Sequence, residues 1–258
     1  MKATLAIAGN TVREALRERL LYNLVIFAVL LSVSSLTISR LTLGEQFRII
    51  ADVSTSSTQV FGILISVFVG VALVSREIDR RTAYAMLARP VSRADFVLGK
   101  FLGLLATAGL NLAVMALASA LVLFLYRGNG SFLGSGFFVA FGLMIAQFAI
   151  CVALAVLFAS FSTPTLAIIF TLAIVGAGFL FTEVRPFWLL SDEAGMKPLV
   201  HVLDFLLPGM GLLDAKEALT YGDTVSLGSF ATRMAYGCGY AGVIVAIAAV
   251  VFSRRDIR

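Results

Sequence analysis

Long runs of apolar residues divide the chain into six segments, each able to cross a lipid bilayer as a helix. The hydrocarbon core of a bilayer is about 30 Å thick and needs roughly 20 helical residues. The runs lie near residues 20–39, 57–75, 101–126, 132–161, 164–182 and 233–252. The fourth run is the longest, so its helix is expected to tilt or protrude. The pattern predicts an all-α integral membrane protein with six transmembrane helices in a single transmembrane domain over residues 1–258.

Residues 3–19 predict an amphipathic helix in the membrane interface, ahead of the first span. Their apolar positions recur at helical spacing at Leu5, Ala8, Val12, Ala15 and Leu16, and the charged positions Arg13, Glu14, Arg17 and Glu18 fall on the other side. A secretory signal peptide with residues 24–38 as its apolar region is the rival interpretation. We expect an uncleaved anchor, because a signal peptide has a short n-region and a 19-residue amphipathic one with two glutamates fits badly.

Lys and Arg are distributed unevenly between the two sides of the membrane. If residues 1–19 are cytoplasmic, 13 of the 20 basic residues lie on the cytoplasmic side. They are Lys2, Arg13, Arg17, Arg19, Arg76, Arg80, Arg81, Arg89, Arg93, Lys100, Arg254, Arg255 and Arg258. This bias satisfies the positive-inside rule, so both termini and residues 76–100 are predicted to be cytoplasmic. Residues 183–232 then lie outside, with a short interfacial helix near 198–208 and with Phe187 and Trp188 as aromatic anchors.

Composition supports a membrane location and argues against nucleic acid as a partner. Hydrophobic residues make up 60% of the chain and charged residues 14%, against roughly 25% in soluble domains. The net charge is +5, but the basic residues stand beside apolar runs, where they set topology and contact anionic lipid headgroups. Cys151 and Cys238 lie in apolar runs without a CxxC partner, which favours packing over a disulfide or a metal site.

The interior of the spans lacks the side chains that ion-coupled transport requires. Asp, Glu, Lys and His do not occur in the six runs, and Arg233 is the first residue of the last one. A transporter coupled to protons or ions normally needs ionisable groups at membrane depth. Asn111 and Gln147 are the notable polar side chains there, and we expect them to form hydrogen bonds between helices.

Motifs for catalysis or nucleotide binding are also missing. The chain has one histidine, His201, and neither HExxH nor GxSxG. Ala94 stands where a P-loop ending at Gly99-Lys100 would need its first glycine, and Phe101 follows. The sequence therefore predicts no catalytic residue, no metal site and no cofactor bound by this chain, and any ATP must be bound elsewhere.

The segment from Ser75 to Lys100 is far longer than a connection between two spans requires. Arg89-Pro90 predicts a helix end, because the residue before a proline avoids the α conformation. Ser92 predicts an N-cap, with Asp95 at the third helical position, so the next helix should begin near Arg93. We expect a helix–turn–helix that stands off the cytoplasmic face. A hairpin that binds lipid headgroups is the alternative.

With its interfacial helix, six spans and the run SREIDRRTAYAMLARPVSRADFVLGKFLG, the chain resembles the membrane subunits of ABC-2 type exporters. The resemblance implies that an acid, Glu77, follows the second span and that a coupling helix spans about 79–87. It implies that a separate ATPase, which binds ATP and Mg, is contacted at Glu77, Asp79, Arg80, Arg81, Thr82, Met86, Leu87, Arg89 and Pro90. The loop at 160–164 carries no charge, so a second contact there would be slight.

The same resemblance implies a dimer, made with a second copy or a paralogous permease, in the cytoplasmic (inner) membrane of a prokaryote. The second and fifth spans would line the translocation cleft through Ser66, Phe68, Thr171 and Phe179, for each of which core packing is the alternative role. Two other functions stay open. One is a non-transporting ABC-type module that passes force to a periplasmic protein, and the other is a passive channel or scaffold.

Overall fold

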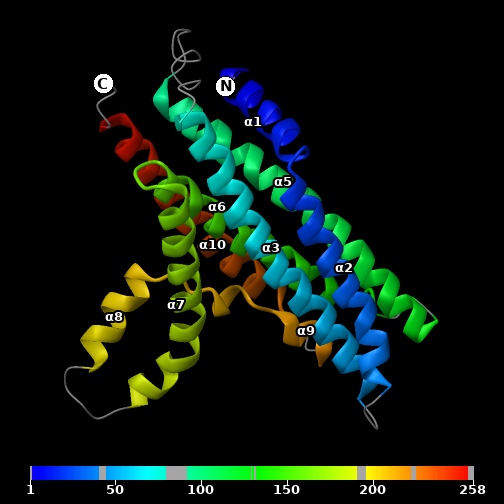
Figure 1. Cartoon of the computed structure of the whole chain (residues 1–258). Helices are drawn as coiled ribbons and strands as arrows, with labels where there is room; N and C mark the ends of the chain where they lie inside the picture. The colour runs from blue at the N-terminus through cyan, green and yellow to red at the C-terminus, as the bar shows by residue number, and fades with distance from the viewer. Residues whose placement is uncertain are drawn as a thin grey trace.

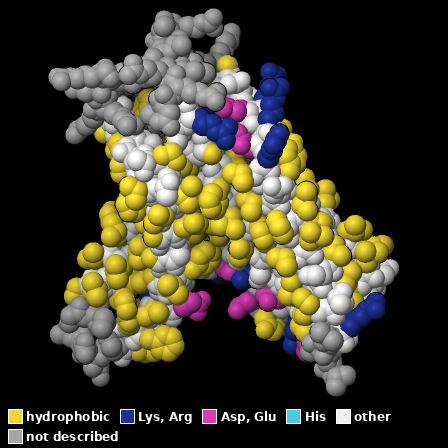
Figure 2. Space-filling model, viewed as in Figure 1, with side chains coloured by type: hydrophobic (Ala, Val, Ile, Leu, Met, Phe, Trp, Pro, Cys, Tyr) yellow, Lys and Arg dark blue, Asp and Glu magenta, His cyan; other side chains and the backbone are white. Residues whose placement is uncertain are grey.

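Helices make up most of the part of the chain that the structure describes. The computed structural model describes residues 2–40, 45–79, 92–128, 130, 132–190, 196–221 and 225–254, and it contains no strand in these ranges (Figure 1). Six helices are long and apolar enough to span a membrane: α2 (Arg19–Ser39), α3 (Gln46–Asp79), α5 (Arg93–Arg127), α6 (Ser135–Ala159), α7 (Pro164–Leu190) and α10 (Leu227–Arg254). The prediction of an all-α protein with six spans is confirmed. Figure 2 shows the expected apolar band across the middle of the molecule, with charged side chains toward its two ends.

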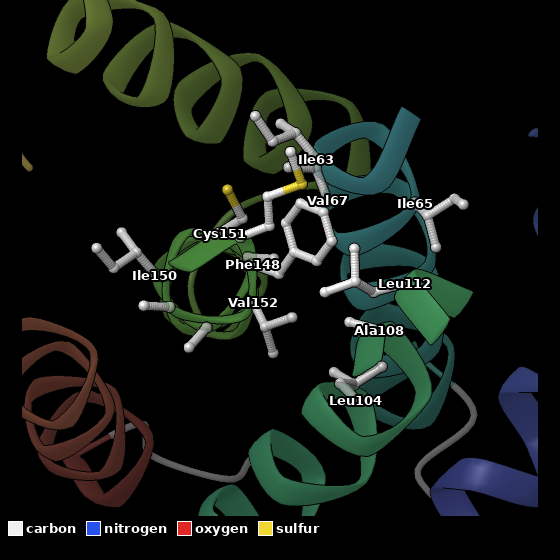
Figure 3. Close-up of a cluster of buried hydrophobic side chains, with 14 of the residues drawn as sticks. Ile63, Ile65, Val67, Leu104, Ala108, Leu112, Phe148, Ile150, Cys151 and Val152 are labelled. Atoms are coloured by element: carbon white, nitrogen blue, oxygen red, sulfur yellow. The ribbon is translucent and has the colours of Figure 1, made fainter. Parts of the chain in front are cut away.

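The helix α6 lies inside the bundle and packs against α3, α5, α7 and α10. Most of its side chains are buried, and Phe148 fills the space that Gly62 of α3 leaves (Figure 3). A Cβ added at Gly62 would lie 2.0 Å from Cζ of Phe148. This close approach is the way helices gain contact in lipid, where van der Waals packing replaces the hydrophobic effect.

The helix α3 extends well before the apolar run that predicted it. Its first turns are polar, yet Ser54, Thr55 and Thr58 are buried. The hydroxyl groups of Thr55 and Thr58 donate to carbonyl groups four residues earlier in the same helix. The helix can therefore bury a polar stretch, because these hydroxyl groups are satisfied within it. In contrast, α6 is shorter than its run and ends at Ala159.

The first helix, α1 (Lys2–Ala15), packs on the first turns of α5 rather than lying apart from the bundle. A Cβ at Gly99 would lie 2.8 Å from Cβ of Ile7, and one at Gly103 would lie 2.7 Å from the carbonyl oxygen of Ala8. Gly99 and Gly103 are four residues apart, so both lie on one face of α5 and let the two helices approach closely.

This contact changes the side of α1 that faces the protein. Thr11 and Ala15 are buried, whereas Leu5, expected on the apolar side of the helix, is 66% exposed. Glu14 and Glu18, expected on the charged side, are partly buried and face ion-pair partners on α5 and α3. The expected apolar side is therefore kept only in part: Ala8 and Ala15 pack toward the protein, while Leu5 does not, because the glycine face of α5 receives α1.

Residues 196–221 form three short elements between α7 and α10: α8 (Met196–Leu206), η1 (Gly211–Leu213) and α9 (Lys216–Thr220). The helix α8, close to the predicted 198–208, forms a hairpin with α7 that stands apart from the other helix ends (Figure 1). Arg185 of α7 and Asp204 of α8 form a salt bridge of 2.8 Å. The chain then bends by 64° and places α9 against α3 and α6.

Candidate coupling site at the base of the 80–91 loop

The segment expected to contact an ATPase connects α3 to α5 in the sequence, and residues 80–91 of it lie outside the described residues. The flanking helix ends lie beside α1 at the end of the molecule that holds both termini (Figure 1). Glu77 is described with its side chain, and Asp79 is the last residue of α3. The other expected contact residues lie outside the described residues: Arg80, Arg81, Thr82, Met86, Leu87, Arg89 and Pro90.

A buried ion pair joins the two helices at the base of this loop. Lys100 of α5 is 1% exposed, and its Nζ lies 2.6 Å from Oε1 of Glu77 on α3. Glu14 of α1 contributes a second carboxylate, with Oε2 3.7 Å from the same nitrogen. A buried ammonium requires such partners, because the charge has lost its water. Three segments that are distant in sequence are therefore held at one point.

A second ion pair holds the junction between α1 and α2. Arg76, one residue before Glu77, forms a bidentate salt bridge with the carboxylate of Glu18. Its Nη2 lies 2.9 Å from Oε2 of Glu18. The side chain of Arg76 is 44% exposed, so the pair contributes little to stability and acts mainly to fix geometry.

The start of α5 is capped as the sequence predicted. Ser92 has extended backbone, and its hydroxyl oxygen accepts a 3.1 Å hydrogen bond from the backbone N–H of Asp95. The same hydroxyl donates to Oδ2 of Asp95 at 2.7 Å. Thr4 donates to Oδ1 of Asp95 at 2.9 Å, which ties the beginning of α1 to this cap. The predicted helix start at Arg93 is confirmed.

The C-terminal part of α10 also contacts the first turns of α5. Phe252 stacks on Phe96 of α5, with ring centroids 5.4 Å apart. Taken together, the contacts anchor the ends of the loop to α1, α3, α5 and α10. Such an arrangement can pass a displacement of the loop to several helices at once. Among the described residues, no group of three or more His, Cys, Asp or Glu side chains could hold a metal ion.

The four residues expected to line a cleft are all on α3 and α7. Ser66 is buried and its hydroxyl donates to the carbonyl of Gly62 at 2.8 Å. Thr171 is also buried and donates to the carbonyl of Ala167 at 2.7 Å. Phe68 and Phe179 are partly buried. Their role in a translocation path stays a prediction.

The sequence alone did not identify Lys100 as the central residue of this site. The sequence pattern indicated Lys100 as a cytoplasmic basic residue beside a failed phosphate-binding motif, and Glu14 and Glu18 as the polar side of α1, but no contact among them. The spacing of Gly99 and Gly103 was the available signal, since small residues four apart indicate a helix contact. That signal would have placed Lys100, between the two glycines, close to another helix.

The fold defines the class of this protein: it is a multi-pass α-helical membrane protein with six candidate spans among its described residues. The family follows from the sequence, because a family model described as ABC-2 family transporter protein matches residues 5–257. The chain belongs to the ABC-2 transporter family, whose members are the membrane components of ABC transporters and imply an ABC ATPase as partner. The sequence matches no curated protein.

Proposed function

We propose that this chain is the membrane subunit of an ATP-driven exporter and that residues 79–90 form its contact with a separate ATPase. The supporting observation is the buried Lys100–Glu77 pair, which fixes the two ends of the loop to each other and, through Glu14, to α1. An ion pair at this point would transmit a force applied to residues 79–90 to the helices that carry the paired side chains. A passive connection has no need of a buried charge, which is costly to desolvate.

In the proposed mechanism, ATP binding closes the partner ATPases and displaces the loop. The helices α1, α3 and α5 then move as one unit, since their bases are joined by ion pairs and hydrogen bonds. Their motion relative to α7 opens and closes a path between two copies of the chain. The apolar length of α7 is mostly exposed, whereas that of α3 is mostly buried, which leaves α7 free to face a second copy. The ATPases would contact the loop differently before and after they bind ATP. This difference in contacts supplies the free energy for the helix motion.

The proposed setting is the inner membrane of a prokaryote, with both termini cytoplasmic and ATP and Mg bound by the partner. The distribution of Lys and Arg supports this orientation. The cluster of Arg80, Arg81 and Arg89 would pair with acidic residues of the ATPase. Met86 and Leu87 would supply the buried apolar contact, worth roughly 1.5–3 kcal/mol for each side chain.

The double variant Met86→Asp/Leu87→Asp tests the contact. We expect a tagged variant to insert and dimerise but to lose the ATPase band in a pull-down from membranes, because charged residues cannot enter an apolar cleft unpaired. Phe161→Asp in the short 160–164 loop is the matched control, since Phe161 is exposed on the same side and should not affect the pull-down. An undiminished ATPase band with the double variant contradicts the proposed site. Under the headgroup-binding alternative, only lipid affinity falls.

A second function, force transmission without transport, is favoured by one observation. The segment between α8 and η1 is bonded to α6 and α10, so movement of the bundle would reach the outer segment directly. Reconstitution of the complex in liposomes separates the two functions. ATP-dependent movement of a substrate supports export, and ATP hydrolysis without movement of any tested substrate supports force transmission.

A further inference from the structure

A pocket of about 410 Å³ lies between the start of α3 and α9, at the end of the bundle away from both termini (Figure 1). Its lining comes from two ranges: residues 48–53 of α3, and residues 216–221, which are α9 and its C-cap residue Tyr221. A space of this size between two neighbouring elements means that they are not packed closely along their whole length. The contacts that do bridge them therefore decide how firmly they are held together.

On its other side, α9 packs tightly against α6. A Cβ added at Gly136 of α6 would lie 2.3 Å from the carbonyl oxygen of Ala218, which is itself buried. The turn before α9 is held by the same helix, because Gln147 donates to the carbonyl of Met210 at 3.0 Å. Residues 210–221 are thus fixed to α6, and a tilt of α3 relative to α6 would change the width of the pocket.

Two polar side-chain contacts bridge α3 and residues 210–221. Gln59, which is 4% exposed, donates through Nε2 to Oδ2 of Asp214 at 3.3 Å. Nearer the beginning of α3, the guanidinium of Arg48 lies 4.9 Å from the ring centroid of Tyr221. The first contact is a long hydrogen bond and the second a cation–π contact of exposed side chains, so each is weak enough to break and re-form.

Neither contact leaves an unpaired charge behind when it breaks. Both carboxylate oxygens of Asp214 have a partner on Lys216: Oδ2 lies 3.2 Å from its Nζ, and Oδ1 accepts a 3.1 Å hydrogen bond from its backbone N–H. Arg48 keeps its ion pair with Glu45, at 2.9 Å. Since desolvated, unpaired charges are what makes such a separation costly, the start of α3 can leave α9 at a low cost.

The remaining bond of Gln59 supplies a pivot for this movement. Its Nε2 also donates to Oε1 of Gln147 on α6, at 3.0 Å. A tilt of the start of α3 about this point releases Asp214 without separating α3 from α6. The helix α3 is continuous from Gln46 to Asp79, so the tilt also moves its other end, where Glu77 lies about 27 Å along the helix from Gln59.

We propose that residues 210–221 form a gate on the start of α3, latched by the Gln59–Asp214 and Arg48–Tyr221 contacts, and that tilting of α3 opens the pocket between them. The gate rests on the proposed function only for the force that opens it, which would enter α3 at Glu77. The latch itself follows from the contacts of the isolated chain and can be tested without an ATPase.

The test measures how often the pocket opens in the full chain, purified in detergent. A cysteine is placed on α3 by Val53→Cys or on α9 by Thr220→Cys, at pocket residues that are partly buried and buried, respectively. The exposed Cys238 is replaced by alanine, and the buried Cys151 stays as a reporter of unfolding. The rate of reaction with N-ethylmaleimide, a neutral reagent, is followed by mass spectrometry and rises with the population of the open state.

Gln59→Leu and Tyr221→Leu should each raise the labelling rate at both probe positions about fivefold, because each removes one latch contact and no net charge changes. Tyr221→Phe keeps the aromatic ring and is the matched control for Tyr221→Leu. Ser66→Ala, which removes a hydroxyl group bonded within α3, is the control for Gln59→Leu. Both controls should label at the rate of the wild type.

The Tyr221 pair decides the outcome, because it leaves the amides of Gln59 and Gln147 untouched. Faster labelling at both probes in Tyr221→Leu but not in Tyr221→Phe, with Cys151 unreacted, supports the gate. Rates equal to that of the wild type in both leucine variants overturn it. Labelling of Cys151 in step with the probes also overturns it, since the open state would then be the unfolded chain.

The same probes in the complex with the ATPase separate the gate from the proposed function. A labelling rate that changes when ATP is added, and that no longer changes in Tyr221→Leu, supports a gate driven through α3. If the rate responds to Tyr221→Leu but not to ATP, the gate stands and the proposed entry of force at Glu77 is contradicted.

Discussion

At the scale of single residues, the most demanding feature is a fully buried lysine. Lysine is almost never buried without a partner, because its ammonium group loses strong hydration. Lys100 meets this requirement with Glu77 and Glu14, which come from two other helices. The glycines on either side of it bring α1 close enough for Glu14 to reach the ammonium group. A local sequence choice thus determines where three helices meet.

The variant Lys100→Met should reduce the free energy of unfolding by about 3–5 kcal/mol, because it leaves Glu77 buried without its cation. Denaturant unfolding of the detergent-solubilised protein measures this change. The double variant Lys100→Met/Glu77→Leu should recover most of the loss, since neither buried charge remains. Arg76→Gln, at an exposed pair, is the control and should cost about 0–1 kcal/mol. If Lys100→Met lowers the free energy of unfolding no more than Arg76→Gln does, the Lys100–Glu77 pair does not hold α3 and α5 together.

At the scale of elements, the turn between α8 and η1 shows how irregular backbone is accommodated inside the bundle. Backbone groups buried away from water need partners, because an unpaired buried N–H or C=O is costly. Side chains of α6 and α10 supply them here: Gln147 donates to the carbonyl of Met210, Tyr236 accepts from the N–H of Gly209, and Tyr240 donates to the carbonyl of Leu206. The distances are 3.0, 2.8 and 2.8 Å.

Gln147 also links this turn to α3. Its Oε1 accepts a 3.0 Å hydrogen bond from Nε2 of Gln59, so the expected interhelical role of Gln147 is confirmed. Asn111, for which the same role was expected, instead donates to the carbonyl of Thr107 within its own helix. Both side chains are buried. The difference arises because a side chain that finds an acceptor one turn away needs no second helix.

We expect Gln147→Leu to loosen the turn, because the variant leaves the carbonyl of Met210 and the amide of Gln59 without this partner. Amide hydrogen exchange should become faster across residues 207–220, because the free energy of opening the turn falls by about 1–3 kcal/mol. Asn111→Leu removes a hydrogen bond within one helix and serves as the matched control. Exchange across 207–220 that is identical in the two variants would contradict the role given to Gln147.

At the scale of the whole molecule, the orientation in the membrane can be tested with single cysteines. Cys151 is buried and Cys238 is exposed, so both are first replaced by alanine. In intact cells, a cysteine at Glu45→Cys should react with a membrane-impermeant thiol reagent, and one at Arg80→Cys should not, because the basic segments are retained inside. Reaction at position 80 without permeabilisation would show that the orientation is the reverse of the predicted one. The proposed ATPase contact would then lie outside the cell, where no ATPase can reach it.

Properties that depend on neighbouring residues could be predicted from the sequence. The six spans follow from hydropathy, because an apolar helix of sufficient length satisfies its own backbone in lipid. The starts of α5 and α7 follow from Ser92 and Pro164, because capping and the fixed φ of proline act within one turn. Membership of the ABC-2 family likewise rests on the sequence, over residues 5–257.

Only the tertiary structure decided which distant residues meet. The sequence did not indicate that Glu14, Glu77 and Lys100 converge, that α1 turns its glutamates toward the protein, or that Gln147 supports a turn more than sixty residues later. The beginning of α3 is polar enough to suggest a loop, yet it is helical because the bundle buries it and the hydroxyl groups of Thr55 and Thr58 bond within the helix. Helix formation in lipid is a local consequence of composition, whereas the pairing of charges and amides depends on how the helices pack. The spacing of Gly99 and Gly103 marks a face for close contact, but it does not say which helix packs there.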